Sequence, residues 1–596
     1  MYPCIIADIA RARVGYDAYS VTMYIDIVPN RSSPPAVLLR RAWREGGKIR
    51  KETVANLSAL PMDQIEQFRR VLKGETLVSA DDAFQVLRSR PNGHVAAVVG
   101  TMRRLGLPEL LSTRKHRKRQ LVLAMIAARI LEPCSKLATA QRLNADTLSS
   151  SLGEAVGVGQ ADADDLYEAL DWLVRGQARI EGKLAERHLE EGDLVLWDVT
   201  PVPFESRTSE LAAFGRPRGS KKSQRQLLFG LLATQQGVPV AVEVFPGNTG
   251  DPDTVSVALD RLQERFGLRR AVMVGDRGMI TERRIEEELR PRGIDWITSL
   301  RAPTIRKLWK EGPLQLSLFD EQDLAEIRSP DFPGERLIAC RNPLLAEDRA
   351  RTRQELLEAT EAKLEAIVAA TLREQRPLRG KDTIGVRVGK VLGASKVAKH
   401  FRYEITEDAF TVRRDEDSIV QEAALDGVYV VRTSVPEEEL DSEAVVRAYK
   451  DLSEVEQAFR VMKTFHLEVH PVRHRREDRV RAHVFLCMLA YYVRLHMERA
   501  LAPLLFTDHA PEAGDARRTS IVAPARRSEA GERKVRRRRT EGGQPARSLD
   551  SLLADLKTLT KNETRVEGTE VTFQKYARPT PLQEQAFELL DVSYRL

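Results

Sequence analysis

The sequence predicts an α/β protein, built on a core of buried strands that follows a helical region and is interrupted by an insertion. Short apolar runs bounded by turn residues occur at 194–199, 227–234, 238–245 and 271–275, which is typical of buried strands. Before them, apolar residues recur at helical spacing in 121–131. Together these patterns predict strands that alternate with helices, with helices also preceding them.

Residues 1–90 are predicted to form a mixed α/β region. Residues 19–28 are rich in β-branched and aromatic side chains, which indicates a strand. Two glycines at 46–47 turn the chain before a second strand over 49–54, and a basic helix over 62–72 follows.

Residues 91–190 are predicted to form a helical, DNA-binding region. The acidic cluster 162–165 is expected to cap a helix whose apolar residues run over 166–174. Residues 114–119 are six consecutive basic or titratable side chains. They either contact a DNA backbone or form the solvated start of a helix.

Residues 191–300 and 441–500 are predicted to make the two parts of one core. Three neighbouring strands, a helix over 254–266 and a further strand follow one another, which is the order of a ribonuclease-H-like core. Other mixed α/β sheets are compatible with the same periodicity.

The rest of the chain differs in pattern from this core. Residues 301–440 contain strand-like stretches and a charged helix, and are predicted to be a β-containing insertion domain. Residues 501–596 are predicted to be a basic linker and a helical C-terminal tail. Within them, 511–547 is rich in Ala, Arg, Pro and Gly, which predicts disorder, and a helix is expected over 548–561.

The bulk composition restricts the class of protein. The 596 residues are too many for one core, and the net charge of +7 suits a polyanionic partner, although charged soluble proteins share it. The four cysteines are far apart and form no CxxC pair, which excludes a zinc ribbon and a disulfide framework. Without a signal-peptide pattern or a long apolar span, we expect a cytoplasmic protein outside membranes.

Two aspartates each end an apolar run of the predicted core, at Asp198 and Asp276. Strand alternation puts Leu196 and Asp198 on one face, where an ionised carboxylate needs a partner because unpaired burial is costly. Ligands of open α/β sheets gather at the carboxyl ends of parallel strands. If these two strands are parallel, both aspartates reach one site.

Glu456 lies on a predicted amphipathic helix. At about 100° per residue, Tyr449, Arg460 and Lys463 fall within about 40° of it, whereas Glu454 points to the opposite side. Basic side chains of this kind suit phosphate. The pattern therefore predicts that Glu456 lies at the border between the core and a cleft that receives a phosphate.

We predict that Asp198, Asp276 and Glu456 are the catalytic and metal-binding residues. Carboxylate oxygens favour hard cations, so two Mg²⁺ or Mn²⁺ ions are expected rather than zinc. Two such ions activate a water or a 3′ hydroxyl for phosphoryl transfer. Taken singly, Asp198 is also compatible with capping a turn, Asp276 with pairing to Arg277, and Glu456 with an exposed helix surface.

These residues resemble those of the DDE transposases of bacterial insertion sequences, in the branch with a Y-(2)-R-(3)-E-(6)-K signature. Tyr449, Glu456 and Lys463 match that spacing, while Leu452 stands where the pattern has Arg. Arg460 is a candidate to replace the lost charge. The resemblance covers roughly 193–499.

The resemblance implies a ribonuclease-H-like core with an insertion between the second Asp and the Glu. It implies binding of double-stranded DNA, both transposon ends and target, followed by cleavage and strand transfer by a protein that is a homodimer on DNA and lies at the bacterial nucleoid. Within the insertion, an aromatic side chain is expected to stack on a flipped base. Trp309 and Trp296 are the candidates, and burial in a core is the alternative for each.

The residues predicted to contact DNA lie either near the acidic residues in the sequence or in the insertion. They are Tyr449, Arg460, Lys463, Arg277 and Trp309. Two other functions are compatible with the same residues. One is a nuclease of the same fold that does not join strands, and the other is a catalytically inactive DNA-binding derivative.

Overall fold

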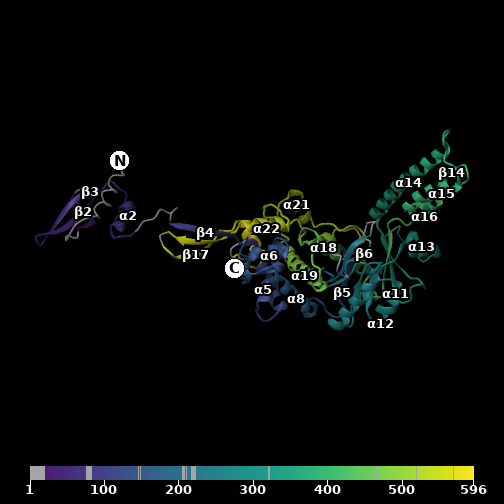
Figure 1. The fold of residues 1–596 in the computed structure, drawn as a ribbon, viewed down its shortest axis with the longest axis horizontal. Coiled ribbons are helices and arrows are strands. Elements are labelled where there is room, and N and C mark those ends of the chain that lie inside the picture. Colours follow the sequence, from purple (N-terminus) through teal and green to yellow (C-terminus); the bar gives the residue numbers. More distant parts are fainter. Residues whose placement is uncertain are drawn as a thin grey trace. The chain divides into compact units, whose positions relative to one another are not determined.

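The structure is a computed structural model. It describes residues 21–31, 33–75, 83–144, 147, 149–204, 209, 211–215, 223–319, 322–464, 466–518, 520–567 and 569–595. The chain forms two compact units, Met1–Ser89 with Asn562–Lys575, and Arg90–Lys561 with Tyr576–Leu596 (Figure 1). Among the described residues, no helix is long and apolar enough to cross a membrane.

The smaller unit contains an antiparallel sheet of order β1-β2-β3, made by β1 (Thr22–Val28), β2 (Ala36–Glu45) and β3 (Lys48–Asn56). Gly46 and Gly47 have φ values of +59° and +78°, which the tight turn between β2 and β3 requires. Helix α2 (Met62–Leu72) packs on β1 and buries Ile65. The predicted second strand and basic helix are confirmed, while the first predicted strand begins outside the described residues.

The C-terminal part of the chain returns to pair with the segment that follows this region. Strand β16 (Thr560–Val566) lies between β17 (Thr572–Tyr576) and β4 (Phe84–Pro91) in a three-stranded sheet. The sequence prediction contained none of these three strands, and the pairing of β16 with β4 joins segments at almost opposite ends of the chain.

The larger unit begins with the helical region that the sequence predicts. Its helices are α3 (Gly93–Arg104), α4 (Leu107–Leu111), α5 (Arg117–Leu131), α6 (Lys136–Leu143), α7 (Leu152–Val156), α8 (Ala163–Arg175) and α9 (Gln177–His188). The expected cap of α8 is confirmed: Asp162 accepts from the backbone N–H of Asp165 at 2.8 Å, and Asp165 accepts from that of Asp162 at 3.2 Å.

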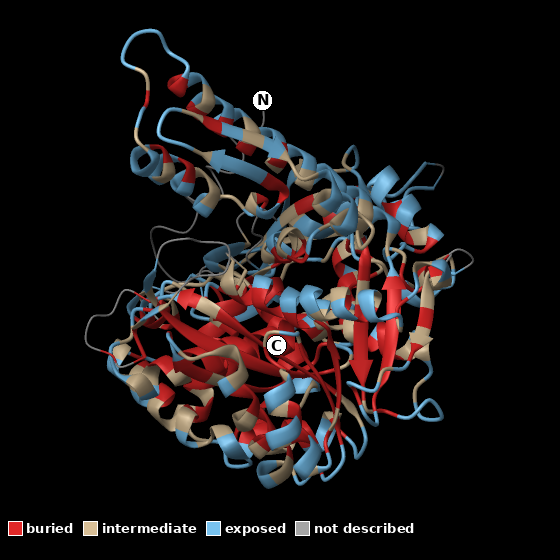
Figure 2. Cartoon of the chain, turned by 90° about the vertical axis from the view of Figure 1, so that its right-hand side faces the viewer, coloured by how far each residue is buried: buried red, intermediate tan, exposed pale blue. Residues whose placement is uncertain are grey.

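The core sheet has the strand order of a ribonuclease-H-like fold. Its strands are β5 (Leu194–Pro203), β6 (Ala213–Gly215), β7 (Gln224–Thr234), β8 (Pro239–Pro246), β9 (Val272–Val274) and β10 (Asp295–Ser299). They lie in the order β10-β9-β5-β7, with β8 and β6 also paired to β7. Strands β9 and β10 run parallel to β5, while β7 and β8 are antiparallel neighbours. Figure 2 shows this sheet as largely buried.

Helical segments connect the strands of this sheet. Between β8 and β9 lie η1 (Asp251–Thr254), α10 (Val255–Asp260) and η2 (Arg261–Arg265), which confirms the helix predicted there. The indole N–H of Trp197 on β5 donates to the Thr254 hydroxyl at 3.3 Å, so the Trp197 face of the sheet is the one that these helices cover. Side chains alternate along a strand, so Asp198 points to the opposite face.

Three strands that the sequence analysis assigned to a separate insertion domain instead extend the core sheet. Strands β11 (Leu324–Ile327), β12 (Arg336–Arg341) and β15 (Val428–Thr433) continue it beyond β10 in the order β11-β12-β15-β10. An exposed edge of β10 would leave backbone groups unpaired, and β15 pairs with them. Local periodicity does not reveal which sheet a strand joins, so this correction depends on the tertiary structure.

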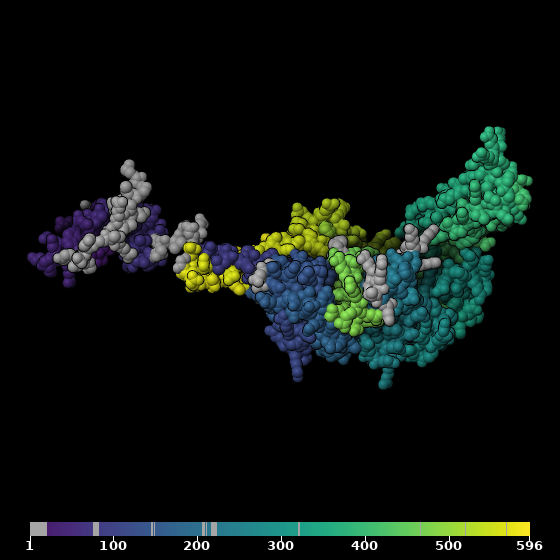
Figure 3. Space-filling model, viewed as in Figure 1, coloured from purple at the N-terminus to yellow at the C-terminus, as the bar shows by residue number. Residues whose placement is uncertain are grey.

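The segment between β12 and β15 projects from the sheet that these strands extend. It consists of α14 (Pro343–Thr371), α15 (Lys381–Ala394), η5 (Ala398–His400), β13 (Phe401–Ile405), β14 (Phe410–Arg414) and α16 (Glu416–Ala423). It has an apolar cluster of its own, which includes Leu364, Ile384 and Phe410. Figures 1 and 3 show it projecting from the core. The insertion is therefore mainly helical, with a single β-hairpin.

The described residues of 511–547 are folded, in contrast to the predicted disorder. They include α20 (Pro511–Asp515) and α21 (Glu529–Arg537). Lys534 is only 2% exposed, and its ammonium donates to the carbonyls of Ala502 and Thr507, both at 2.7 Å. Composition alone suggested a solvated basic segment, because it does not show that carbonyl groups surround this cation. Helices α22 (Leu549–Lys557), as predicted, and α23 (Pro581–Leu590) follow.

Gly230 on β7 provides a test of how tightly this sheet is packed. A Cβ atom at Gly230 would lie 2.3 Å from the ring of Trp197. We expect Gly230→Val to lower the free energy of unfolding by about 1–3 kcal/mol, because the core cannot take the added volume. Urea unfolding measures the change. Gly182→Ala on α9 is the control, since no atom lies within 4 Å of its added Cβ, and it should leave stability equal or raised.

Candidate active site

Asp198 lies on β5, and Asp276 lies two residues beyond the end of β9, the parallel neighbour of β5. The last pair of these strands is Leu196 of β5 with Val274 of β9. If the register continued for two more residues, Asp198 would stand beside Asp276, at the spacing of about 4.8 Å that separates neighbouring strands. The parallel arrangement that the sequence analysis required is thus present, and it joins two residues that are far apart in the chain.

The structure corrects the position of Asp198 within its strand. Strand β5 continues to Pro203, so Asp198 lies in the middle of the strand rather than at its end. Its residue is 6% exposed, and its Oδ1 accepts from the N–H of Val199 at 2.8 Å. Beyond Asp198 the pairing with β7 continues, since Pro201 pairs with Leu228.

Asp276 lies just beyond β9, and its backbone neighbours orient it. Its Oδ1 accepts from the N–H groups of Gly278 and Met279, both at 2.9 Å. Within the described part of the chain, Oδ2 of Asp276 accepts no hydrogen bond. The half-buried carboxylate therefore keeps one oxygen for a ligand.

The predicted single helix around Glu456 is in fact two helices, α17 (Ser442–Lys450) and α18 (Leu452–Lys463), separated at Asp451. Tyr449 and Glu456 consequently lie on different helices, which changes the prediction that one helical face carries both. Asp451 accepts from the side-chain amide of Gln235 at 2.9 Å, a contact 216 residues away in sequence that local periodicity does not reveal.

Two side-chain contacts show where α17 and α18 cross the sheet. The Tyr449 hydroxyl lies 2.8 Å from that of Ser299, at the end of β10. The Lys463 ammonium donates to the Thr200 hydroxyl on β5. Strand β9 lies between β10 and β5, and Glu456 is midway in sequence between Tyr449 and Lys463. Glu456 thus lies in sequence between a residue that contacts β10 and a residue that contacts β5, the two neighbours of β9.

Packing supports this placement of α18. Strand alternation puts Asp198 and Thr200 on one face of β5, and Phe229 is the partner of Thr200 on β7. The Phe229 ring meets that of Phe459 on α18 edge to face, with centroids 5.3 Å apart. Helix α18 thus covers the face of the sheet to which Asp198 points.

Tyr449 shows that two of the carboxylates act on one hydroxyl. Burial raises the pKa of Tyr449, its hydrogen bond with Ser299 lowers that pKa, and the negative charges of Asp276 and Glu456 raise it further. Tyr449 consequently stays protonated, and the electrostatic effect of Asp276 and of Glu456 reaches its hydroxyl.

The three carboxylates do not form a ready-made metal centre. Among the described residues, no three His, Cys, Asp or Glu side chains lie close enough to hold a metal ion together. The oxygens of Asp198 and Asp276 fit a hard cation by their chemistry. Glu456 is exposed on α18, and it has to approach the two aspartates to become a third ligand.

Comparison with known families identifies the chain. The family described as Transposase DDE domain matches residues 190–493, which is slightly more than half of the protein. This chain belongs to the DDE transposases. The family described as IS1634 family transposase, N-terminal domain, matches residues 25–83. No curated protein matches the chain.

The two matches support an insertion-sequence transposase, as the resemblance implied. The DDE match contains all three carboxylates, and DDE transposases generally use divalent metal ions. The second match contains β1, β2, β3 and α2 of the smaller unit. The signature branch stays a prediction, with Leu452 as the first residue of α18 in place of the expected Arg.

The basic residues predicted to contact DNA differ in their surroundings in this transposase. Arg460 is exposed on α18, and Arg277 is exposed directly after Asp276. Lys463 is half-buried against Thr200. Arg460 and Arg277 are consequently accessible to a phosphate from solvent.

The two tryptophan candidates also differ. Trp296 lies on β10, is 2% exposed, and its indole N–H donates to Glu335 at 3.3 Å, so it belongs to the core of the transposase and is not placed to stack on a base. Trp309 lies on α13 (Ala302–Glu311), where it is half-buried against an apolar cluster. Of the two residues, Trp309 is the more exposed.

Two residues of the site were missed by the sequence analysis. Thr200 had a usable signal, because it lies two residues beyond Asp198 and strand alternation puts both on the same face. Ser299 had none, since its role follows from a contact with Tyr449 at a separation of 150 residues. Glu454 was judged to point away, and the structure agrees: its side chain lies against Gly237.

Proposed function

We propose that this transposase binds the terminal inverted repeats of an insertion sequence, cleaves DNA there, and joins the freed end to a target DNA. The observation that supports it most is that the parallel neighbours β5 and β9 lead to Asp198 and Asp276, and that the helix carrying Glu456 covers the face to which Asp198 points. We assign the catalytic role to these three carboxylates.

The proposed metal ligands are the same three residues. Asp198 and Asp276 would hold a divalent cation between neighbouring strands, and Glu456 would complete the set from α18. When bound, two Mg²⁺ or Mn²⁺ ions supply an activated hydroxyl or water and stabilise the leaving oxygen of an in-line displacement.

The remaining proposed roles concern the position of the DNA. Arg460 and Arg277, both exposed, bind phosphate oxygens on either side of the acidic cluster. Tyr449 donates a hydrogen bond from the floor of the site, where Ser299 holds its hydroxyl. Lys463 fixes the end of α18 to β5 through Thr200 and contacts the phosphate from there. Trp309 stacks on a base that leaves the duplex.

Transposition pairs two DNA ends, so we propose that the protein acts on DNA as a homodimer. A nuclease with the same site would cleave DNA by the same chemistry but would not join the cut strands. A catalytically inactive DNA-binding derivative is favoured by two observations, Leu452 at the signature position and the absence of a three-ligand group among the described residues. It predicts DNA binding without metal-dependent turnover.

Metal removal tests the proposed chemistry. With DNA ends taken from the repeats that flank the gene, we expect EDTA to abolish cleavage and added Mg²⁺ to restore it, because the phosphoryl transfer needs hard cations. End binding, measured by gel shift, should persist in EDTA. Products that contain both cut ends and joined strands support a transposase, whereas cut ends alone indicate a nuclease. Binding with no cleavage in Mg²⁺ or Mn²⁺ contradicts the proposal.

A further inference from the structure

A cavity of about 250 Å³ lies outside the candidate active site, between the helical region and the segment that follows α18. Its lining is rich in cations and imidazoles, which include Arg129, Lys136, Arg473, His474 and His483. We call it the cationic pocket. At about 30 Å³ per water, its volume equals roughly eight water molecules, which is enough for a small polyatomic anion.

Two of its cations are buried without a carboxylate partner. Arg129 on α5 is 7% exposed and Lys136, the first residue of α6, is 6% exposed. The guanidinium of Arg129 reaches only three backbone carbonyls, at the long distances of 3.4–3.5 Å. Within the described residues, neither cation forms an ion pair with Asp or Glu. Burial and the charge of Arg129 lower the pKa of Lys136 to about 7.

His483 adds a buried polar atom without a partner. Its residue on α19 (Glu477–Ala500) is 4% exposed. Its Nε2 lies 3.0 Å from the Val469 carbonyl, whereas its Nδ1 meets no hydrogen-bond partner in the described part of the chain. The His474 ring packs beside it, with centroids 5.1 Å apart. Because Nε2 donates to the carbonyl and burial lowers the pKa of His483, Nδ1 is a hydrogen-bond acceptor, available to a hydroxyl group of a ligand in the pocket.

Acidic side chains do not balance these cations. Glu468 is the acidic residue among those that line the cavity, and it is exposed. Asp171 lies nearby, but Arg479 binds both of its oxygens at 3.0 Å. An uncompensated buried cation is costly, and the usual remedy is a bound or paired anion. The pocket therefore lacks a negative charge.

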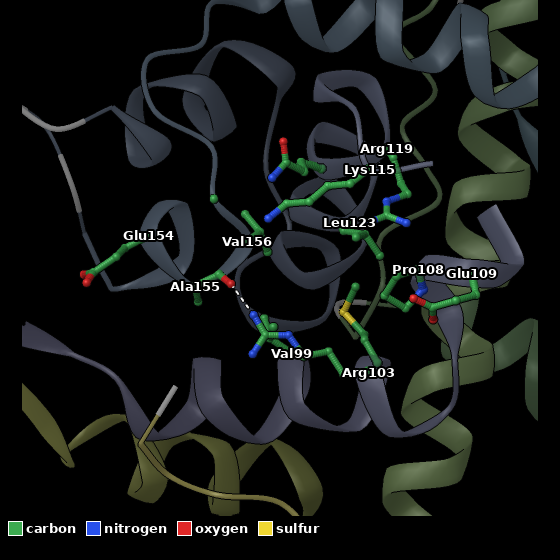
Figure 4. Close-up of a pocket in the computed structure, with 13 residues that line it drawn as sticks. Val99, Arg103, Pro108, Glu109, Lys115, Arg119, Leu123, Glu154, Ala155 and Val156 are labelled. Atoms are coloured by element: carbon green, nitrogen blue, oxygen red, sulfur yellow. Dashed lines mark hydrogen bonds between the residues drawn. The ribbon is translucent and has the colours of Figure 1, made fainter. Parts of the chain in front are cut away.

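A second basic pocket, of about 410 Å³, shows the contrast (Figure 4). It contains Lys115 and Arg119, but the carboxylates of Glu109 and Glu154 also line it. Arg119 donates to the Ser112 carbonyl at a normal distance of 2.8 Å. Two carboxylates thus line that pocket, against the single exposed Glu468 of the cationic pocket.

We propose that the cationic pocket binds a phosphate group. Phosphate oxygens accept from both Lys and Arg, and the charge-assisted bonds would compensate Lys136 and Arg129 together. The walls come from α5, α6, α8 and α19 and from the chain just after α18, so a bound phosphate joins the helical region to the segment that continues from the Glu456 helix. The phosphate comes either from DNA or from a free phosphate compound.

Inorganic phosphate and the full-length chain provide the first test. We expect the thermal midpoint of the wild type to rise saturably with inorganic phosphate, and Lys136→Met to lose this rise. Lys115→Met, in the second basic pocket, is the matched control and should keep it. Without phosphate, Lys136→Met should be at least as stable as the wild type, because it removes an uncompensated buried charge.

A lower midpoint of Lys136→Met without phosphate, together with an unchanged phosphate response, shows a structural lysine and overturns the inference. Arg129→Met provides a second variant for the same measurement, so a folding defect in one variant does not decide the result. The inference is also overturned if Lys115→Met abolishes the phosphate response while Lys136→Met keeps it.

The idea that the bound phosphate belongs to DNA rests on the proposed function, and it is tested separately. If a DNA phosphate fills the pocket, Lys136→Met should lower the slope of log Kd against log salt for end binding by about one. If the slope is unchanged while inorganic phosphate still binds, the ligand is a free phosphate compound. Asp276→Asn distinguishes the two proposals, because it should abolish cleavage and leave the phosphate response intact. If Lys136→Met and Arg129→Met both bind inorganic phosphate and DNA as the wild type does, the proposed site is refuted.

Discussion

Glu456→Gln is expected to lower the rate of DNA cleavage by a factor of about 10² to 10³, because the site loses a carboxylate ligand of the proposed cations while the side chain keeps its size. Glu456 is exposed on α18 and is not part of the packing that holds the helix, which relies on Val455, Phe459 and Met462. The loss should therefore appear in the chemical step rather than in folding. Single-turnover cleavage of a cognate end in Mg²⁺ measures it.

Glu454→Gln is the matched control for this prediction. It makes the same change two residues earlier on the same helix, where the side chain lies against Gly237 instead of facing the aspartates. We expect its cleavage rate to equal that of the wild type. Equal rates for wild type and Glu456→Gln, with both variants folded by circular dichroism, would exclude the assigned acidic triad.

Arg432→Met is expected to lower the free energy of unfolding by about 3–5 kcal/mol, because it leaves a buried carboxylate without its main partner. Arg432 on β15 is 4% exposed, and its Nε donates to Glu335 at 2.6 Å. The Glu335 side chain is 1% exposed and also accepts from the second guanidinium nitrogen of Arg432. Urea unfolding of the full-length protein measures the loss.

A second substitution separates the charge from the packing. In Arg432→Met with Glu335→Gln, the buried residue is neutral, so we expect part of the lost stability to return. Lys307→Met, which breaks an exposed ion pair with Asp331, should change nothing measurable. If the double variant is no more stable than Arg432→Met, lost contacts of the Arg432 side chain, and not the uncompensated Glu335, account for the effect.

Several features of the site could be predicted because their signals are local. Asp198 and Asp276 interrupt apolar runs, and a charge at the end of a buried run indicates a function whatever the fold around it. The acidic cluster before α8 is a helix start, because a capping side chain bonds to the backbone three residues later. Each of these signals consists of a few neighbouring residues, so all of it can be found in the sequence.

Other features depended on partners that are distant in the chain. The break at Asp451 goes with a bond to Gln235, and the position of Tyr449 depends on Ser299. The strands beyond β10 were predicted to belong to a separate domain, because the local sequence pattern of a strand does not show which sheet it joins. The folded state of the basic C-terminal segment depends on carbonyls that meet Lys534.

By itself, the sequence determined the family and the α/β class of the core, and it singled out three acidic residues as candidates, since residue type and spacing carry these without knowledge of any contact. The tertiary structure alone decided that the strands leading to Asp198 and Asp276 are parallel neighbours, that β11, β12 and β15 belong to the core sheet, and that Lys136 and Arg129 line one pocket. The physical reason is that strand pairing and the burial of charge are set by contacts between segments far apart in the chain, which no local pattern encodes.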